Sequence, residues 1–244
     1  MTPETAKAVN ALEAALRELG TPQRAEQEKR YLKSELVHVG VTVPELRKAV
    51  KATYAALRPA HPELIALVTA VWASEIYERR LAAVELLKAG LASLGPQDLP
   101  MIERLIREAA MWALVDPLSG DVAGRIVLRE AASAATLDRW AADPDFWVRR
   151  CALLALLAGI RSGHPDLDRF TAYADAMLGE TEFFVRKAIG WVAGELSKSQ
   201  PAFVTSWAQG NLSRMSGVTF REVVRRLPEP DAERLTRLRA GRGR

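Results

Sequence analysis

Four aromatic residues recur at nearly constant spacing through the middle of this 244-residue chain. The four positions, separated by 35, 35 and 37 residues, are Tyr77, Trp112, Trp147 and Phe184. In segments 75–87, 144–157 and 181–196 the aromatic is followed by one residue, a basic pair, and a run of small and apolar residues. A period in the thirties with two helices per unit is typical of a solenoid, in which each helix pair packs only against its neighbours. The repeat therefore predicts a stacked array of helix pairs, with an irregular helical bundle as the alternative.

The whole chain has the composition of a helical protein. Ala, Leu, Arg and Glu dominate and β-branched runs are rare. Proline suits the first turn of a helix, because its missing N–H would lack an intrahelical partner there. Helix starts are therefore predicted at Thr2-Pro3, Thr21-Pro22, Val43-Pro44, His61-Pro62, Gly95-Pro96, Asp116-Pro117, Asp143-Pro144, His164-Pro165, Gln200-Pro201 and Glu229-Pro230. These marks predict an all-α fold, an α-solenoid of about six helix pairs. Without a convincing strand before a Gly-rich loop, Rossmann and P-loop folds are excluded.

Length and composition limit the class of protein further. Apolar residues make up 49% of the chain, which excludes disorder, and we expect one repeat domain over residues 1–228. Residues 229–244 are expected to form an Arg-rich helix or a flexible arm. No apolar run is long enough for a membrane helix, and the amphipathic start differs from a signal peptide, so we expect a bacterial-type cytosol, close to the nucleoid. One cysteine, Cys151, and three scattered histidines predict no disulfide, zinc site or other metal site.

The charge of the chain is unevenly distributed. Residues 214–244 carry nine Arg against four acids, whereas residues 1–213 have a net charge of −1. A nucleic-acid face in the body must therefore come from charge gathered on one side. The basic pairs of the repeat, Arg79-Arg80, Arg149-Arg150 and Arg186-Lys187, would form such a stripe, because equivalent positions of a solenoid share one surface. A positive stripe of this kind suits the phosphate backbone of duplex DNA. The alternative is salt bridges to nearby acids such as Glu75, Glu78 and Glu182.

One pair of residues could carry catalysis. Trp112 and Asp116 are four residues apart, so they would share a helix face. An indole could hold a deoxyribose while the carboxylate stabilises the oxocarbenium-like sugar formed as a glycosidic bond breaks. The alternative is that Asp116 caps a helix that starts at Pro117. Proline also disfavours α geometry at the residue before it.

Other aromatic residues lie beside basic ones. Trp191 follows Lys187 by four residues, and Tyr31 stands between Arg30 and Lys33. Faces that combine an aromatic ring with a cation suit contacts to the backbone and sugars of nucleic acids. For each aromatic residue the alternative is a place in the hydrophobic core. A structural role is expected for His38, His61, His164 and Cys151.

Five segments together resemble the AlkD-like DNA alkylation repair glycosylases, which are built on HEAT-like repeats. The segments are EKRYLKSELVHVGVTVPELRKAVK at 28–51, WASEIYERRLAAVELL at 72–87, WALVDPLSGDV at 112–122, FWVRRCAL at 146–153 and EFFVRKAIGWV at 182–192. They occur in the family's order and spacing over most of the chain up to about residue 227. The chain is therefore identified as a member of this family.

The resemblance implies a curved array with a concave basic groove for double-stranded DNA. It implies excision of positively charged alkylated purines, such as 3-methyladenine and 7-methylguanine, without insertion of the base into a pocket. The family's catalytic aspartate falls on Asp116, its cleft tryptophans on Trp112 and Trp191, and its cleft arginine on Arg150. Tyr31 matches a family aromatic near the DNA. No cofactor is implied, and a monomer is expected.

Two departures from the family pattern concern the catalytic segment. Ala113 stands where relatives often carry an acid, and Pro117 directly follows the catalytic position. A non-catalytic DNA-binding paralogue that recognises distorted or branched DNA is therefore an alternative function. A protein-interaction scaffold, a common use of such solenoids, is a third.

Overall fold

The computed structural model describes residues 2–241 and is built from helices throughout that range. Within the described residues no β-strand forms, and the isolated parallel bridge between Val37 and Ile76 is the one β-type pairing. The chain divides into two compact units, residues 1–98 and 99–244. Each unit is described by itself.

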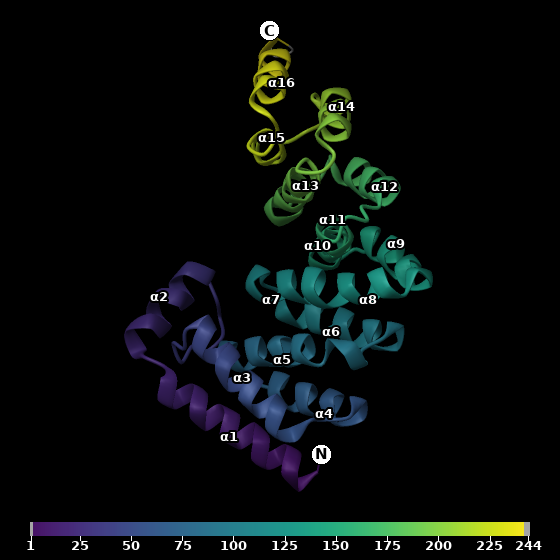
Figure 1. Ribbon diagram of the computed structural model, residues 1–244. Coiled ribbons are helices and arrows are strands. Elements are labelled where there is room, and N and C mark those ends of the chain that lie inside the picture. The colour runs from purple at the N-terminus through teal and green to yellow at the C-terminus, as the bar shows by residue number, and fades with distance from the viewer. Residues whose placement is uncertain (1, 242–244) are drawn as a thin grey trace. The chain divides into compact units, whose positions relative to one another are not determined.

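The first unit contains five α-helices, coloured purple to blue in Figure 1. They are α1 (Pro3–Leu19), α2 (Pro22–Leu32), α3 (Val43–Leu57), α4 (His61–Trp72) and α5 (Tyr77–Ala89), followed by the short 3-10 turns η1 (Leu91–Ser93) and η2 (Pro96–Asp98). Proline stands in the first turn of α1 to α4, as the sequence predicts. Thr42 and Glu45 form a reciprocal capping box at the start of α3. Local signals therefore define where these helices begin.

Helix α5 forms the centre of the first unit, packing against both α3 and α4. Its buried side includes two acids, Glu78 and Glu85, as well as apolar residues. Helix α2 is the opposite case, because Leu32 is its one buried residue. Apolar burial therefore holds α5 firmly and contributes little to the placement of α2.

The second unit is also built from α-helices joined by short segments, and it contains more of them (Figure 1). They are α6 (Leu99–Ala109), α7 (Trp112–Pro117), α8 (Gly124–Arg129), α9 (Ala135–Ala141), α10 (Phe146–Ala155), α11 (Leu157–Arg161), α12 (Leu167–Met177), α13 (Phe183–Leu196), α14 (Pro201–Asn211), α15 (Gly217–Val224) and α16 (Glu229–Gly241). Helix α10 packs against α9 and α13, and α13 packs closely on α15. Two glycines of α13 allow this approach: a Cβ at Gly190 would lie 2.5 Å from the Glu222 Cβ, and one at Gly194 would lie 3.2 Å from the Glu222 carbonyl.

The predicted helix start at Asp116-Pro117 is wrong. Helix α7 begins at Trp112 and includes both residues, and the π-helical segment η3 (Leu118–Ala123) leads on into α8. A proline inside a helix removes a backbone donor and crowds the preceding turn. The wider turn that follows Pro117 absorbs this crowding, and the Ser119 hydroxyl donates to the Val115 carbonyl at 2.6 Å. Asp116 is therefore a helical residue and not a cap.

The predicted fold class, an all-α helical repeat, is confirmed. Within residues 2–241 no helix combines the length and apolar character needed to cross a bilayer. The Arg-rich end forms α16 over residues 229–241, and this helix packs on α14 and α15. Arg242 and Arg244, part of the same predicted segment, lie outside the described residues.

Candidate functional site

A buried ion pair joins α7 to α10 in the second unit. The Asp116 carboxylate accepts two hydrogen bonds from the Arg150 guanidinium, from Nε to Oδ1 and from Nη2 to Oδ2, both at 2.8 Å. The Arg150 side chain is 3% exposed and that of Asp116 16%. Two parallel hydrogen bonds fix the plane of the carboxylate as well as its position. Asp116 is thus oriented by a side chain one repeat away in the sequence.

Helix α13 completes the surroundings of Arg150. Its remaining terminal nitrogen, Nη1, donates to the Phe184 carbonyl, and the guanidinium lies 5.8 Å from the centre of the Phe184 ring. Phe184 in turn packs on Trp147, with ring centroids 4.8 Å apart. The resemblance placed Arg150 in a DNA-binding cleft. In this structure its nitrogens point to Asp116 and to Phe184, which suits a residue that holds the carboxylate.

The electrostatics of Asp116 reflect two opposing effects. Burial raises the pKa of Asp116 above its ordinary value of 3.8, whereas the hydrogen bonds and charge of Arg150 and the charge of Lys187 lower it. Burial is the larger effect. The nearby cations therefore offset much of the cost of ionising a carboxyl group in this setting. Lys187 is itself exposed, with Nζ 6.0 Å from the centre of the Phe183 ring.

The two predicted site tryptophans are half-buried and lie on α7 and α13. Trp112 opens α7 four residues before Asp116, and Trp191 lies on α13 four residues after Lys187. Residues four apart in a helix share a face. Each indole therefore lies on the helix face that also bears a charged residue of the site. Neither is among the fully buried tryptophans, such as Trp140.

Arg149 and Arg186, two further basic residues of the second-unit repeats, are hydrogen-bonded to other groups of the protein. Arg149 donates from Nε to Glu180 at 2.6 Å and from Nη1 to the Asp143 and Pro144 carbonyls. Arg186 donates to the Glu180 carbonyl at 2.5 Å. Both arginines therefore converge on the loop before α13. The acid involved is Glu180 and not Glu182, the candidate partner from the sequence.

The first basic pair has a similar environment in the first unit. Arg79 binds the Glu13 carboxylate at 2.8 Å and the Ala70 carbonyl at 2.7 Å. Arg80 donates to the Ser74 carbonyl at 2.8 Å and lies over the Trp72 ring. By contrast, Tyr31 and Lys33 at the end of α2 are exposed, Tyr31 to 73%. Lys33 caps that helix in a left-handed conformation, with φ 51°. The position of Lys33 is therefore determined by the backbone conformation at the end of α2.

Residues 12–227 match the family model described as DNA alkylation repair enzyme, which is most of the chain. The chain belongs to this family. No curated protein sequence shows significant similarity to it.

Solved structures of similar fold include the following three. A structure described as a predicted DNA alkylation repair enzyme from Enterococcus faecalis is 21% identical with a TM-score of 0.79, over 86% of this chain and 97% of that one. AlkD2 from Streptococcus mutans is 15% identical, with a TM-score of 0.55 over 88% and 97%. The alkylpurine DNA glycosylase AlkC of Pseudomonas fluorescens, bound to DNA with an abasic site analogue, is 16% identical with a TM-score of 0.55 over 96% and 65%. These likenesses show a shared helical fold.

Sequence analysis did not single out Phe183 and Phe184 as site residues, although both lie near the Asp116–Arg150 pair or its neighbours. Phe184 supplies both the carbonyl and the ring that surround Arg150. Phe183 is 51% exposed and packs edge-on against Phe184, with ring centroids 5.4 Å apart. The doubled phenylalanine is visible in the sequence, where the other repeats have Ile76-Tyr77 and Phe146-Trp147. It places an aromatic ring at the surface next to Lys187.

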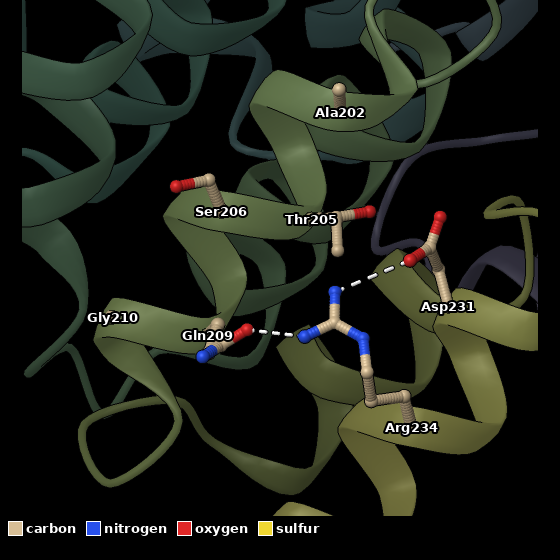
Figure 2. A pocket seen from close by; sticks show the side chains of 7 residues that line it. All are labelled: Ala202, Thr205, Ser206, Gln209, Gly210, Asp231 and Arg234. Atoms are coloured by element: carbon tan, nitrogen blue, oxygen red, sulfur yellow. Dashed lines mark hydrogen bonds and ion pairs between the residues drawn. The ribbon is translucent and has the colours of Figure 1, made fainter.

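A separate hollow of about 590 Å³ lies between α14 and α16 in the same unit (Figure 2). From α16, Arg234 reaches across it to Gln209 on α14, and it also pairs with Asp231 of its own helix at 3.2 Å. Arg234 is the one cationic side chain among the described residues that line the hollow, and its guanidinium is bound by two other lining residues. These contacts dock the C-terminal helix onto α14, and the hollow does not share residues with the Asp116 site.

The sequence predicts structural roles for Cys151, His61 and His164, and the environments of the three residues differ. Cys151 is fully buried, and burial raises the pKa of its thiol to about 12. His61 hydrogen-bonds Asp98 at 2.9 Å, and His164 is exposed. A buried thiol with so high a pKa is a poor nucleophile.

Proposed function

We propose that this protein is a DNA glycosylase that hydrolyses the N-glycosidic bond of positively charged alkylated purines in duplex DNA. The substrates would be of the 3-methyladenine and 7-methylguanine type. The observation that carries the proposal is the Asp116 carboxylate, which is held flat against Arg150 instead of being tied to backbone amides. Its helix also presents Trp112 on the face of Asp116.

The chemistry follows from the charge of the leaving group. A nucleoside alkylated at N3 of adenine or at N7 of guanine is already cationic, so the departure of its base needs no general acid. Positive charge then moves to the deoxyribose as the bond breaks, and a fixed carboxylate stabilises that charge without reorganising. Asp116 would supply this stabilisation and orient the attacking water. Trp112 and Trp191 would pack against the sugar.

Contacts to DNA are proposed for the predicted basic and aromatic residues. Exposed Lys187 and Lys33 would bind phosphates, and Tyr31 would contact the backbone. The other arginines predicted to bind DNA, Arg79, Arg80, Arg149 and Arg186, have partners within the protein, so we propose that they contribute positive charge near the DNA without direct phosphate contacts. The DNA bound to AlkC supports a DNA partner for this fold.

The decisive experiment measures release of 7-methylguanine and 3-methyladenine from methylated duplex DNA. Asp116→Asn is expected to slow excision by about 100-fold or more, the usual effect of losing a preorganised charge stabiliser. Asp143→Asn is the matched control, because Asp143 is a comparably buried acid that also receives two hydrogen bonds from one arginine, Arg107. The control should excise at the wild-type rate.

The saturated Asp116–Arg150 pair also favours a second candidate, a DNA-binding protein without glycosylase activity. In that case the pair would serve only to join α7 to α10. Wild-type protein that releases no alkylated base, but binds structured DNA in a salt-sensitive way, would support this candidate and refute the first. Equal excision by wild type and Asp116→Asn would remove Asp116 from the mechanism.

A further inference from the structure

Three side chains that the proposed glycosylase site does not use meet inside the first unit. Glu28 lies on α2, His38 in the segment between α2 and α3, and Glu78 on α5. One ligand atom from each lies within 4.8 Å of the other two. The side chains of His38 and Glu28 are 1% and 14% exposed, and Glu78 is fully buried. A histidine and two carboxylates thus share one enclosed volume.

Part of this cluster lacks hydrogen-bond partners. Both ring nitrogens of His38 and the Oε2 atom of Glu28 are buried and, among residues 2–241, find no hydrogen-bonding atom. The shortest polar approach, from His38 Nδ1 to Glu28 Oε2, is 3.8 Å, too long for a hydrogen bond. Buried polar atoms are nearly always satisfied in folded proteins. His38 Nδ1 and Glu28 Oε2 lie 3.8 Å apart, each buried and unsatisfied, which therefore points to an occupant bound at the cluster.

The Glu78 carboxylate is held by backbone amides of the segment that follows His38. Its Oε1 accepts hydrogen bonds from the backbone amides of Val39, Gly40 and Val41, whereas Oε2 accepts one from Val39 at 3.0 Å. These amide donors fix the position and the plane of the carboxylate. Oε2 accepts fewer hydrogen bonds than Oε1 and so has more capacity left for a further ligand. Ligating carboxylates that are themselves hydrogen-bonded are usual in metal sites.

The charge of the cluster favours a cation. Two carboxylates are present, and Arg24 forms an ion pair with Glu28 at 3.4 Å. His38 stacks on Tyr77, with ring centroids 4.6 Å apart, which orients the imidazole. With a neutral imidazole the group carries a net negative charge, and burying an uncompensated charge is costly.

We propose that Glu28, His38 and Glu78 bind a Zn²⁺ ion. Imidazole nitrogen and carboxylate oxygen are ordinary zinc ligands at bond lengths of about 2.0–2.2 Å, so a small contraction of the cluster brings all three onto one ion. Water would fill the remaining position. The sequence predicted no metal site because cysteines and histidines alone were counted, whereas two of these ligands are glutamates.

The ion would hold a helix that the core hardly holds. Helix α2 buries Leu32 alone, and the Glu28 ligand would tie it to Glu78 on α5. Exposed Tyr31 and Lys33 stand at the end of that helix. Zinc would therefore position the segment that carries them, whether or not they contact DNA. The inference is independent of the proposed glycosylase activity.

The test is zinc binding by the full chain after dialysis against a chelator. Calorimetric titration with Zn²⁺ is expected to give one equivalent per chain, and at 100-fold excess over Kd the Tm should rise by about 5–10 °C. Added Co²⁺ should give visible ligand-field absorption. Glu28→Gln and His38→Gln should lose all three responses. His61→Gln is the matched control and should keep them, because His61 faces a single carboxylate, Asp98.

Two results would overturn the proposal. One is a wild-type chain that shows no saturable binding at micromolar free Zn²⁺. The other is zinc binding that folded Glu28→Gln protein retains in full. Circular dichroism identifies folded variants, and Glu28→Gln decides the matter if His38→Gln does not fold.

Discussion

Arg150 holds Asp116 through two hydrogen bonds of 2.8 Å although the two residues are 34 positions apart. Neighbouring repeats thus contribute different parts of the pair: one repeat supplies the acid and the next supplies the base that orients it. Stacking of repeats brings them together, because positions one period apart lie on adjacent helices. The site is a product of the repeat architecture and not of one contiguous motif.

Removal of Arg150 should strongly destabilise the protein. Arg150→Ala leaves the Asp116 carboxylate buried without its cation, and we expect the free energy of unfolding to fall by about 3–5 kcal/mol. Arg30→Ala is the control, since both partners of the Arg30–Glu26 pair are 75% exposed. It should change stability by about 0.5 kcal/mol or less. Urea denaturation of both variants measures the difference, and comparable losses would contradict the structural role of the buried pair.

The proposed reaction should lose activity in acid at a higher pH than an ordinary aspartate would give. Asp116 must be ionised to stabilise the sugar cation, and burial raises its pKa above 3.8. The rate should therefore fall as the pH drops through that raised pKa. The charge of Lys187 lowers the pKa of Asp116, so Lys187→Gln should move the acid limb to higher pH.

Single-turnover excision rates across the acid range measure both effects. Lys198→Gln serves as the control, because Lys198 is an exposed lysine of the same unit that pairs with Glu195. An acid limb unmoved by Lys187→Gln would show that the limiting ionisation belongs to another group.

The salt dependence of DNA binding should separate exposed cations from those held by the fold. Each lost phosphate contact lowers the slope of log K against log salt by about 0.9. We expect this change for Lys187→Ala and for Lys33→Ala, whose side chains are exposed. Arg79→Ala should leave the slope nearly unchanged, because Arg79 is bound to Glu13 and to the Ala70 carbonyl. Fluorescence anisotropy with a duplex at several salt concentrations gives the slopes, and an equal drop for Arg79→Ala would place it on the DNA.

The close packing of α13 on α15 should depend on Gly190. An added methyl group would lie 2.5 Å from the Glu222 Cβ and 2.8 Å from the Thr219 carbonyl, so Gly190→Ala should cost about 1–3 kcal/mol. Gly210→Ala in α14 meets no atom within 4 Å and should stabilise by about 0.5–1 kcal/mol through better helix propensity. Thermal unfolding should therefore shift in opposite directions for the two variants, and shifts of the same sign would contradict this account.

Much of the fold could be predicted from the sequence because its signals are local. Proline and capping residues define the starts of α1 to α4 and of α14, and the aromatic spacing reveals the repeat. The same local rule failed at Pro117. There the preference of proline for a helix start is overridden by the tertiary contacts of α7 and by the wide turn after it.

The site was less accessible to sequence analysis, because its decisive contacts are long-range. The sequence singles out Asp116 and Arg150 separately, through the resemblance, but nothing in it shows that they bind each other. The partner of Arg79 is Glu13, 66 positions away, in a helix without the repeat motif. Likewise the meeting of Glu28 with Glu78, 50 positions apart, is a long-range contact that no local pattern reveals.

The short α7 leaves no tolerance for changes in chain length. Successive residues of an α-helix are rotated by about 100° around its axis, so deleting one residue between Trp112 and Asp116 would turn the carboxylate away from Arg150. The wide π-helical turn directly after α7 already accommodates Pro117, so it cannot also absorb a change in length. A lineage that gains or loses a residue here would forfeit the alignment of acid and indole in one step.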